Sequence, residues 1–381
     1  MFGHLDRVTP RHVHGWAATS DGSPVDIIVL VNDVPVSSIK TVTVRPDLVN
    51  YPRKDVGFDS ELPRSLEIGD VVGAVFENNQ HLSGSPYTVT TLEGSREEKA
   101  LWLVLRDMKL LEIGPSFNPT APRLAGWNCF SLDHATQEEL RIKYQGQQEI
   151  DRIEPVDYLW RGGPMESAIP AAEHSTFDAI IASHVIEHIP DPIAFFTSTA
   201  TLLKEDGLVS LVIPDKRWMF DFFKPLSSTS DFLSAHHLRR TRHSKQTAFN
   251  NLAYNVHENG EIAWSPRILS KFGFFGENVL NHASDFSDAF AEDESSPYVD
   301  FHASIFTPSS FGLIMLELGQ LGVLPFRVER RFPPSGCEFY VTLRKGGTPL
   351  LDSKSLDEQR LRLMKDIVIE LGEQARCLLD N

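Results

Sequence analysis

Residues 110–115 read Leu-Leu-Glu-Ile-Gly-Pro, and residues 177–184 read Phe-Asp-Ala-Ile-Ile-Ala-Ser-His. In each stretch a short apolar run ends at polar or turn-forming residues, as expected of a buried strand in a parallel sheet. Three further runs have the same form, at residues 128–132, 154–156 and 208–213. Because predicted helices separate these runs, the order of elements predicts an α/β domain built on one open, mostly parallel sheet.

The elements around these strands complete the domain. Helices are predicted at residues 138–144, 192–203 and 307–321, and two last strands at residues 326–330 and 338–343. Asp191 is a suitable N-cap for the second helix, and Pro192 fits its first turn because a proline there loses no hydrogen bond. The short connection through Gly336 favours an antiparallel hairpin for the last two strands.

The chain before this domain has a different pattern. Short β-branched runs occupy residues 25–31, 39–44, 70–76 and 87–91, with turn-forming residues between them. They predict a small all-β sandwich or jelly-roll domain over residues 1–92, which a linker helix at 93–107 joins to the α/β domain. The α/β domain itself is expected over residues 108–350, with residues 224–300 as an insertion that fits no βα unit.

A C-terminal helix is expected over residues 351–381. Its apolar residues recur at alternating spacings of three and four, at Leu361, Met364, Val368, Leu371, Ala375 and Leu378. Such a stripe is typical of a coiled-coil seam and suggests a homo-oligomer that forms through this helix. Packing of the helix on its own domain explains the stripe equally well.

Composition excludes several partners. The 381 residues include 36 Lys and Arg against 52 Asp and Glu, a net charge of −16, so nucleic acid is a poor partner. No apolar run approaches the roughly 18 residues of a membrane span, and the N-terminal residues lack the pattern of a signal peptide. The three cysteines are widely spaced and odd in number, which suggests a reducing compartment. We therefore expect a cytoplasmic protein.

Ligands of open parallel sheets bind at the carboxyl ends of the strands, and here those ends are acidic. The first turn, residues 114–119, holds one glycine and two prolines, and proline has no N–H to offer a phosphate. This disfavours NAD, FAD and ATP. S-adenosylmethionine has no phosphate, and its ribose hydroxyls and cationic sulfur suit an acidic site.

The ordered series of motifs resembles class I S-adenosylmethionine-dependent methyltransferases. It comprises residues 110–115, Asp133, residues 177–188, residues 208–217, Asp221, residues 306–308 and residues 338–339. Within that superfamily the series is most similar to a methyltransferase-type-11-like bacterial group found with surface-polysaccharide genes, and the likeness covers about residues 108–345. Residues 14–16, 45–48, 57–58 and 84–86 are similar to a small β-domain attached to some bacterial glycan-modifying enzymes.

The resemblance implies a Rossmann-like seven-stranded sheet whose last strand is antiparallel. It assigns S-adenosylmethionine to the following residues: Glu112, Gly114, Pro115 and Ser116 at its methionine end, Asp133 and His134 at the ribose, Asp157 and Tyr158 at the adenine, and Ser183, His184 and Val185 along its flank. The family's first motif usually has two or three glycines, whereas this chain has Pro115 and Ser116.

The implied activity is O-methylation of a sugar, nucleotide sugar or glycan intermediate of cell-surface polysaccharide. A sugar hydroxyl is a weak acid and needs a base, for which we consider His188 first, then Asp215, His302 and His184. A structural role for His188, and an ion pair between Asp215 and its neighbours Lys216 and Arg217, are the alternatives. Candidate acceptor-binding residues are Arg217, Arg239, Arg240 and His302.

Two other functions remain open at this point, methylation of a non-carbohydrate small molecule and a catalytically silent scaffold that binds an adenosyl ligand or a glycan. Asp300 and His302 have a spacing suited to a metal, but two ligands do not make a site, so no metal is expected.

Overall fold

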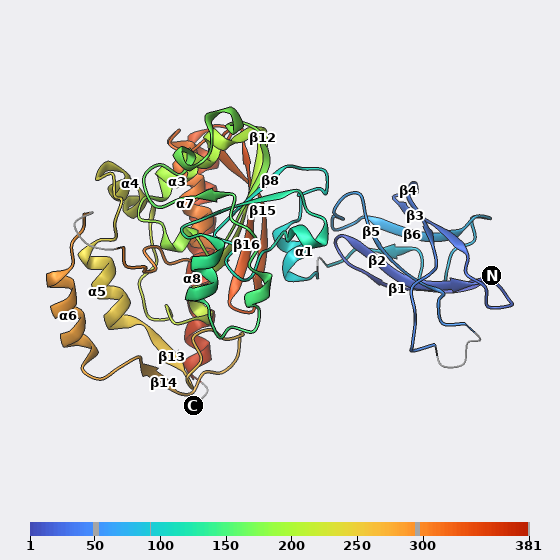
Figure 1. Cartoon of the computed structure of the whole chain (residues 1–381), viewed down its shortest axis with the longest axis horizontal. Helices are drawn as coiled ribbons and strands as arrows, with labels where there is room; N and C mark the ends of the chain where they lie inside the picture. The colour runs from blue at the N-terminus through green and yellow to red at the C-terminus, as the bar shows by residue number, and fades with distance from the viewer. Residues whose placement is uncertain (49–52, 92, 294–297, 380–381) are drawn as a thin grey trace. The chain divides into compact units, whose positions relative to one another are not determined.

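The computed structural model describes residues 1–48, 53–91, 93–293 and 298–379. The chain divides into two compact units, Met1–Leu105 and Arg106–Asn381, and each is considered by itself (Figure 1).

Unit 1 consists of two antiparallel sheets. One has the order β1 (Phe2–Val8), β2 (His12–Ala18), β5 (Gly57–Glu61), and the other the order β4 (Val34–Lys40), β3 (Asp26–Val31), β6 (Val71–Phe76), β7 (Tyr87–Thr88). Both sheets contribute to one apolar core, in which Val13, Ile27 and Phe58 are buried. The prediction of an all-β sandwich is thus confirmed.

Strands β1, β2 and β5 were not predicted, because they lack β-branched runs and contain glycine and polar residues instead. Gly15 shows why small residues occur there. A Cβ at this position would lie 2.3 Å from the carbonyl oxygen of His4 on β1, so any larger residue would push the two strands apart. The helix expected at 93–107 is also shorter than predicted, since α1 spans only Arg96–Ala100.

Unit 2 is built on a seven-stranded sheet of order β10-β9-β8-β11-β12-β16-β15. Its strands are β8 (Leu110–Ile113), β9 (Cys129–Asp133), β10 (Tyr158–Leu159), β11 (Phe177–Ser183), β12 (Leu203–Pro214), β15 (Phe326–Ser335) and β16 (Glu338–Lys345). The first five are parallel, and β16 pairs antiparallel with both β12 and β15. This confirms the predicted sheet with its antiparallel last strand.

The third strand was predicted at residues 154–156, but β10 begins at Tyr158. Pro155 has no N–H to give to a ladder, so the segment before Tyr158 does not pair as a strand. The structure instead fixes the segment at Asp157, whose carboxylate accepts a hydrogen bond from the backbone N–H of Ser131 on β9 (2.8 Å).

The helices of unit 2 are α2 (Gln137–Lys143), α3 (Pro192–Leu202), α4 (Thr229–His237), α5 (Lys245–Tyr254), α6 (Val279–Ala289), α7 (Pro308–Gln320) and α8 (Ser353–Leu379). Asp191 caps α3 as predicted, because its side chain accepts a hydrogen bond from the N–H of Ala194 (3.0 Å). The insertion contains α4, α5 and α6 together with a small hairpin of β13 (Val256–Glu258) and β14 (Phe272–Phe274). None of the described helices is sufficiently long and apolar to cross a bilayer.

The C-terminal helix α8 packs on its own unit through a face that the sequence pattern did not indicate. Leu363 and Gln374 are buried, and the Gln374 amide donates to the carbonyl of Phe222 (2.6 Å). Members of the predicted apolar stripe are exposed instead, with 56% of Leu361 and 69% of Val368 accessible to solvent. Packing on the domain therefore does not account for the stripe, and self-association stays a prediction.

Candidate functional site

The turns after β8 and β11 lie side by side at the carboxyl edge of the sheet. Gly114 has φ +61°, a conformation that favours glycine, and a Cβ at this position would lie 3.5 Å from Cγ2 of Val185. Ser116 also has a positive φ, of 50°. The structure thus brings together Gly114, Ser116 and Val185, three of the residues assigned to the cofactor.

Glu112 has a structural task in this arrangement. Its buried carboxylate accepts hydrogen bonds from the backbone N–H groups of Thr120 (2.7 Å) and Ala121 (3.2 Å). These two hydrogen bonds hold the loop that follows Pro115. Pro115 itself has no backbone N–H to donate. Glu112 therefore shapes the turn whether or not it also contacts a ligand.

Asp133 ends β9 and faces the same turn. Its carboxylate is buried, accepts a hydrogen bond from the N–H of His134 (2.7 Å) and receives a longer one from the N–H of Ser116 (3.4 Å). The imidazole of His134 lies against the same carboxylate, with Nδ1 2.7 Å from Oδ1. Within the described residues the buried Oγ of Ser116 has no hydrogen-bond partner.

Asp157 and Tyr158, the two residues assigned to the adenine, have different surroundings. Asp157 forms an ion pair with Arg123 next to the end of β9. Tyr158 lies apart from the site, because its ring packs against Phe130 and Phe177 and its hydroxyl donates to Glu173 (2.8 Å).

His184 follows Ser183, the last residue of β11, and has a left-handed backbone with φ +53°. Non-glycine residues seldom adopt this conformation, and they persist in it where surrounding contacts hold them. Here Nε2 of His184 lies 2.8 Å from Oε2 of Glu338 at the start of β16, and the hydroxyl of Tyr340 donates to the other oxygen of that carboxylate (2.7 Å). Glu338 was not among the predicted site residues.

His188 is held by an acid from the far end of the insertion. Its Nδ1 lies 2.9 Å from the carboxylate of Asp300. Burial lowers the pKa of His188, but the hydrogen bond to Asp300 and the charge of Glu187 outweigh burial and raise it above the ordinary value. The same contact holds the pKa of Asp300 below its usual range, although burial alone would raise it. In the ligand-free protein these contacts favour protonated His188, which opposes its use as a base.

His302 is buried and also paired with an acid. Its Nδ1 lies 2.5 Å from Asp221, whose other oxygen lies 2.6 Å from the buried ammonium of Lys224. Burial raises the pKa of Asp221, yet the contacts with His302 and Lys224 outweigh burial and hold that pKa below the usual range. Asp300 and His302 do not lie on one strand face, because residues 298–306 form no strand.

Asp215 and Arg217 form a buried ion pair with each other, so the structure supports the alternative that the sequence left open. The guanidinium donates two hydrogen bonds to the carboxylate, Nε to Oδ1 (2.9 Å) and Nη2 to Oδ2 (2.6 Å), and a third to Glu373 of α8 (2.6 Å). Both side chains are almost inaccessible to solvent. Neither the carboxylate nor the guanidinium is placed to meet an acceptor.

The two arginines of the insertion differ. Arg240 pairs with Glu292 of the same insertion (3.0 Å), whereas Arg239 is exposed. Of the two, Arg239 has the side chain more accessible to an anionic ligand.

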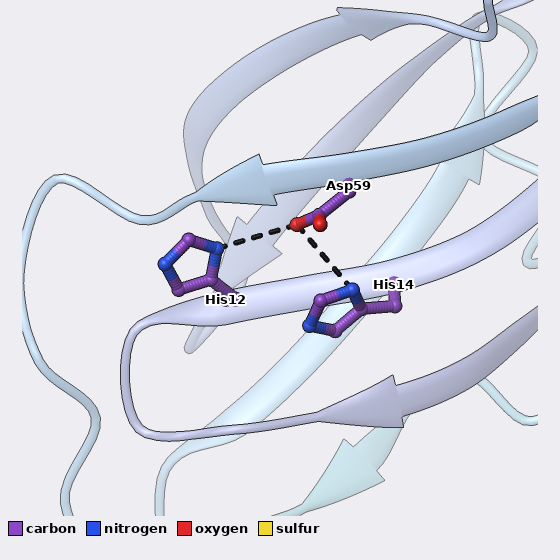
Figure 2. A group of neighbouring side chains, drawn as sticks. All are labelled: His12, His14 and Asp59. Carbon is purple, nitrogen blue, oxygen red and sulfur yellow. Dashed lines mark hydrogen bonds and ion pairs between the residues drawn. The ribbon is translucent and has the colours of Figure 1, made fainter. Parts of the chain in front are cut away.

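Unit 1 holds a separate cluster of possible ligands (Figure 2). His12 and His14 extend from one face of β2 toward Asp59 of β5, and their Nδ1 atoms lie 3.2 Å and 3.3 Å from the same carboxylate oxygen. A third to a half of each side chain is exposed to solvent. A hydrogen bond between His12 and Asp59 and an ion-pair contact between His14 and Asp59 explain this geometry without an ion.

Comparisons with known proteins give the site its chemical context. A family model described as a methyltransferase domain matches residues 76–265. No curated protein matches the chain. Among solved structures, the chain is similar to an S-adenosylmethionine-dependent methyltransferase from Aquifex aeolicus, with 12% identity over 62% of this chain and 82% of that chain and a TM-score of 0.30.

Two further solved structures are similar at the same level. A methyltransferase from Methanosarcina mazei has 12% identity over 65% of this chain and 95% of its own, with a TM-score of 0.30. The methyltransferase CalH in complex with S-adenosylhomocysteine (SAH) has 12% identity over 62% of this chain and 51% of its own, also with a TM-score of 0.30. The family model and the strand order agree with the motif series, and the chain therefore carries a class I methyltransferase domain and is an enzyme that takes its methyl group from S-adenosylmethionine.

Proposed function

We propose that the enzyme methylates a hydroxyl group of a sugar, nucleotide sugar or glycan intermediate of cell-surface polysaccharide. The observation that carries this proposal is the polar character of the site beside Val185. His184, His188 and His302 lie there with carboxylates at their ring nitrogens, so the surroundings suit a hydroxylated acceptor better than an apolar one. The motif resemblance to methyltransferases of polysaccharide gene clusters supports the acceptor class.

Methyl transfer is an in-line displacement at carbon. The acceptor oxygen attacks the methyl group, the bond from carbon to sulfur breaks, and S-adenosylhomocysteine leaves. Because the sulfonium is already a good leaving group, the protein contributes mainly by aligning the acceptor with the methyl group and by providing for the hydroxyl proton. In our proposal Asp133 and the turn at Gly114 hold the cofactor, and the histidines after β11 face the acceptor.

The insertion 224–300 completes the proposed acceptor site. Asp221 just before it and Asp300 at its end position His302 and His188 through hydrogen bonds. Exposed Arg239 is then the cation available for an acidic or phosphorylated sugar. We place the reaction in the cytoplasm, because the odd number of widely spaced cysteines suits a reducing compartment.

A methyl-transfer screen tests the proposal. Purified protein is incubated with S-adenosylmethionine that carries a labelled methyl group, together with nucleotide sugars, cell-envelope glycan extracts and, as the competing class, phenolic and other non-carbohydrate hydroxyl compounds. We expect label in a carbohydrate product whose mass rises by one methyl group. Transfer only to the non-carbohydrate set would overturn the acceptor class while leaving the methyltransferase activity in place.

A further inference from the structure

Glu187 is a fully buried acid of unit 2, which carries the methyltransferase sheet and is called the catalytic unit below. It has no solvent exposure, and neither carboxylate oxygen has a hydrogen-bond partner among the described residues. The nearest ring nitrogens are Nδ1 of His184 at 3.6 Å and Nε2 of His188 at 3.8 Å, both too far for a hydrogen bond. A buried charge without compensation is costly, so its surroundings indicate a missing positive partner.

Two histidines near Glu187 each direct one ring nitrogen at a different acid. His188 gives its Nδ1 to Asp300, and His302 gives its Nδ1 to Asp221. These contacts at Nδ1 orient both rings and leave Nε2 as the atom that each ring can offer to a metal ion. The 3.8 Å between Nε2 of His188 and the Glu187 carboxylate is slightly longer than the separation of two ligand atoms on one ion.

The distances fit such an ion. The ligand atoms of Glu187, His188 and His302 all lie within 4.8 Å of one another. Ligand atoms that are each about 2.0–2.2 Å from one ion lie about 3–3.6 Å apart, so small side-chain movements suffice to close the site. The carboxylates behind both histidines are a second feature of metal centres, in which they orient the rings and increase their basicity.

We propose that Glu187, His188 and His302 bind a divalent transition-metal ion of the Mn²⁺ to Zn²⁺ series, with Asp300 and Asp221 as positioning residues. Two imidazoles and one carboxylate suit these ions and leave coordination positions open. His184 is not one of the three ligands, although its Nδ1 lies 3.6 Å from the Glu187 carboxylate while its Nε2 contacts Glu338.

The proposed ion gives the site a way to activate an alcohol, and in this respect the inference rests on the proposed function. An acceptor hydroxyl bound to the ion has a lowered pKa and releases its proton to water, as water bound to catalytic metals does. The resulting alkoxide attacks the methyl carbon, an oxygen–carbon bond forms, and the sulfur–carbon bond breaks to give neutral S-adenosylhomocysteine. In this scheme His188 is a metal ligand and not the base.

Metal binding is measured first, on the full chain freed of metal by dialysis against a chelator. The exposed cluster of unit 1 is removed by His12→Ala with His14→Ala, so that any remaining site belongs to the catalytic unit. We expect this double variant to bind one Mn²⁺ or Zn²⁺ per chain by calorimetry, and to give a Co²⁺ absorption spectrum with intense ligand-field bands. Absence of both would overturn the proposal.

Two added substitutions locate the ion within the catalytic unit. Glu187→Gln keeps the size of the side chain and removes its charge, and should abolish metal binding. Asp300→Asn alters an accessible positioning residue and should weaken metal binding by about 10- to 100-fold. Undiminished affinity in both variants would place the ion elsewhere and overturn the assignment.

Cofactor binding separates this inference from the proposed function. Calorimetry with S-adenosylhomocysteine should give the same affinity in the Glu187→Gln variant as in the parent, which also shows that the variant is folded. In the methyl-transfer screen, chelator should stop product formation and Mn²⁺ should restore it. Transfer that continues in chelator would overturn the metal role while supporting the methyltransferase, whereas metal binding without transfer to any carbohydrate would contradict the acceptor class alone.

Discussion

Asp215 and Arg217 are joined by two parallel hydrogen bonds in the interior of the catalytic unit, two residues apart in the chain. The guanidinium extends beyond the carboxylate to Glu373, so one buried cation links the end of β12 to α8. Asp215 was a candidate base, but its geometry indicates that it stabilises this link between β12 and α8.

Asp215→Asn should therefore destabilise the fold. The substitution leaves the buried guanidinium with Glu373 alone, and the loss of one partner of a buried ion pair costs about 3–5 kcal/mol. The double variant Asp215→Asn with Arg217→Met removes the unpaired charge as well and should recover part of this free energy of unfolding. Urea denaturation of the single and double variants measures both values. A single variant of unchanged stability that has lost methyl transfer would restore Asp215 as a catalytic residue.

Asp133→Asn tests the cofactor site. If the carboxylate accepts the ribose hydroxyls, its neutral analogue should weaken binding of S-adenosylmethionine by about 1–3 kcal/mol, the usual cost of losing a charged hydrogen-bond partner. Calorimetry provides the affinity, and Asp151→Asn on the surface of the same unit serves as the matched control. Equal affinities in the two variants would remove Asp133 from the binding site.

Lys216 gives a prediction for pH dependence. Burial lowers the pKa of its ammonium to about 8 in the folded protein, from 10.5 for an ordinary lysine. Below pH 8 the folded state thus carries an unfavourable charge, and this penalty decreases as pH rises from 8 to 10.5, where the unfolded chain also loses its proton. Lys216→Met should increase the free energy of unfolding at pH 7 by up to about 3 kcal/mol.

The gain in free energy of unfolding from Lys216→Met should be smaller at pH 9 and vanish near pH 11. Denaturation of the variant and the wild-type protein at pH 7, 9 and 11 measures this gain. A constant difference across this range would mean that Lys216 keeps its ordinary pKa in the fold.

The exposed stripe of α8 predicts self-association. Leu361 and Val368 lie two turns apart on the solvent face of the helix, where a second copy of the stripe would cover them. We expect sedimentation velocity to show a concentration-dependent dimer that Leu361→Glu with Val368→Glu converts to a monomer. The exposed substitutions Lys354→Glu and Glu358→Lys provide a control for charge. A wild-type chain that sediments as a monomer at every concentration would refute the prediction.

Sequence patterns located the strands that the core buries on both faces, because continuous apolar runs such as residues 177–182 have few alternatives. They failed at β10, where Pro155 removes a ladder donor, and at β1 and β2, where close packing selects glycine over β-branched residues. Local signals thus sufficed where burial alone determines the element. Local signals were not sufficient where backbone contacts with a neighbouring strand determine the element.

The candidate site also contains residues that the sequence could place and residues that it could not. The residues at strand ends, such as Gly114 and Val185, are neighbours because parallel strands end at one edge. The contacts of the histidines depend on tertiary structure, since His302 meets Asp221 across 81 residues and His184 meets Glu338 across 154. Glu187 had no signal of its own, because an acid after a strand is common and only its burial sets it apart.

Because β16 runs antiparallel to β12, the β15–β16 hairpin offers a place to alter the acceptor preference of this enzyme. Strands that run with their neighbours present their last residues at the reactive edge, whereas β16 presents its first residue, Glu338, directly after the hairpin tip at Gly336. Alterations of that tip can act on the proposed acceptor site through the contact of Glu338 with His184. The hairpin is therefore a suitable region for laboratory evolution of acceptor preference.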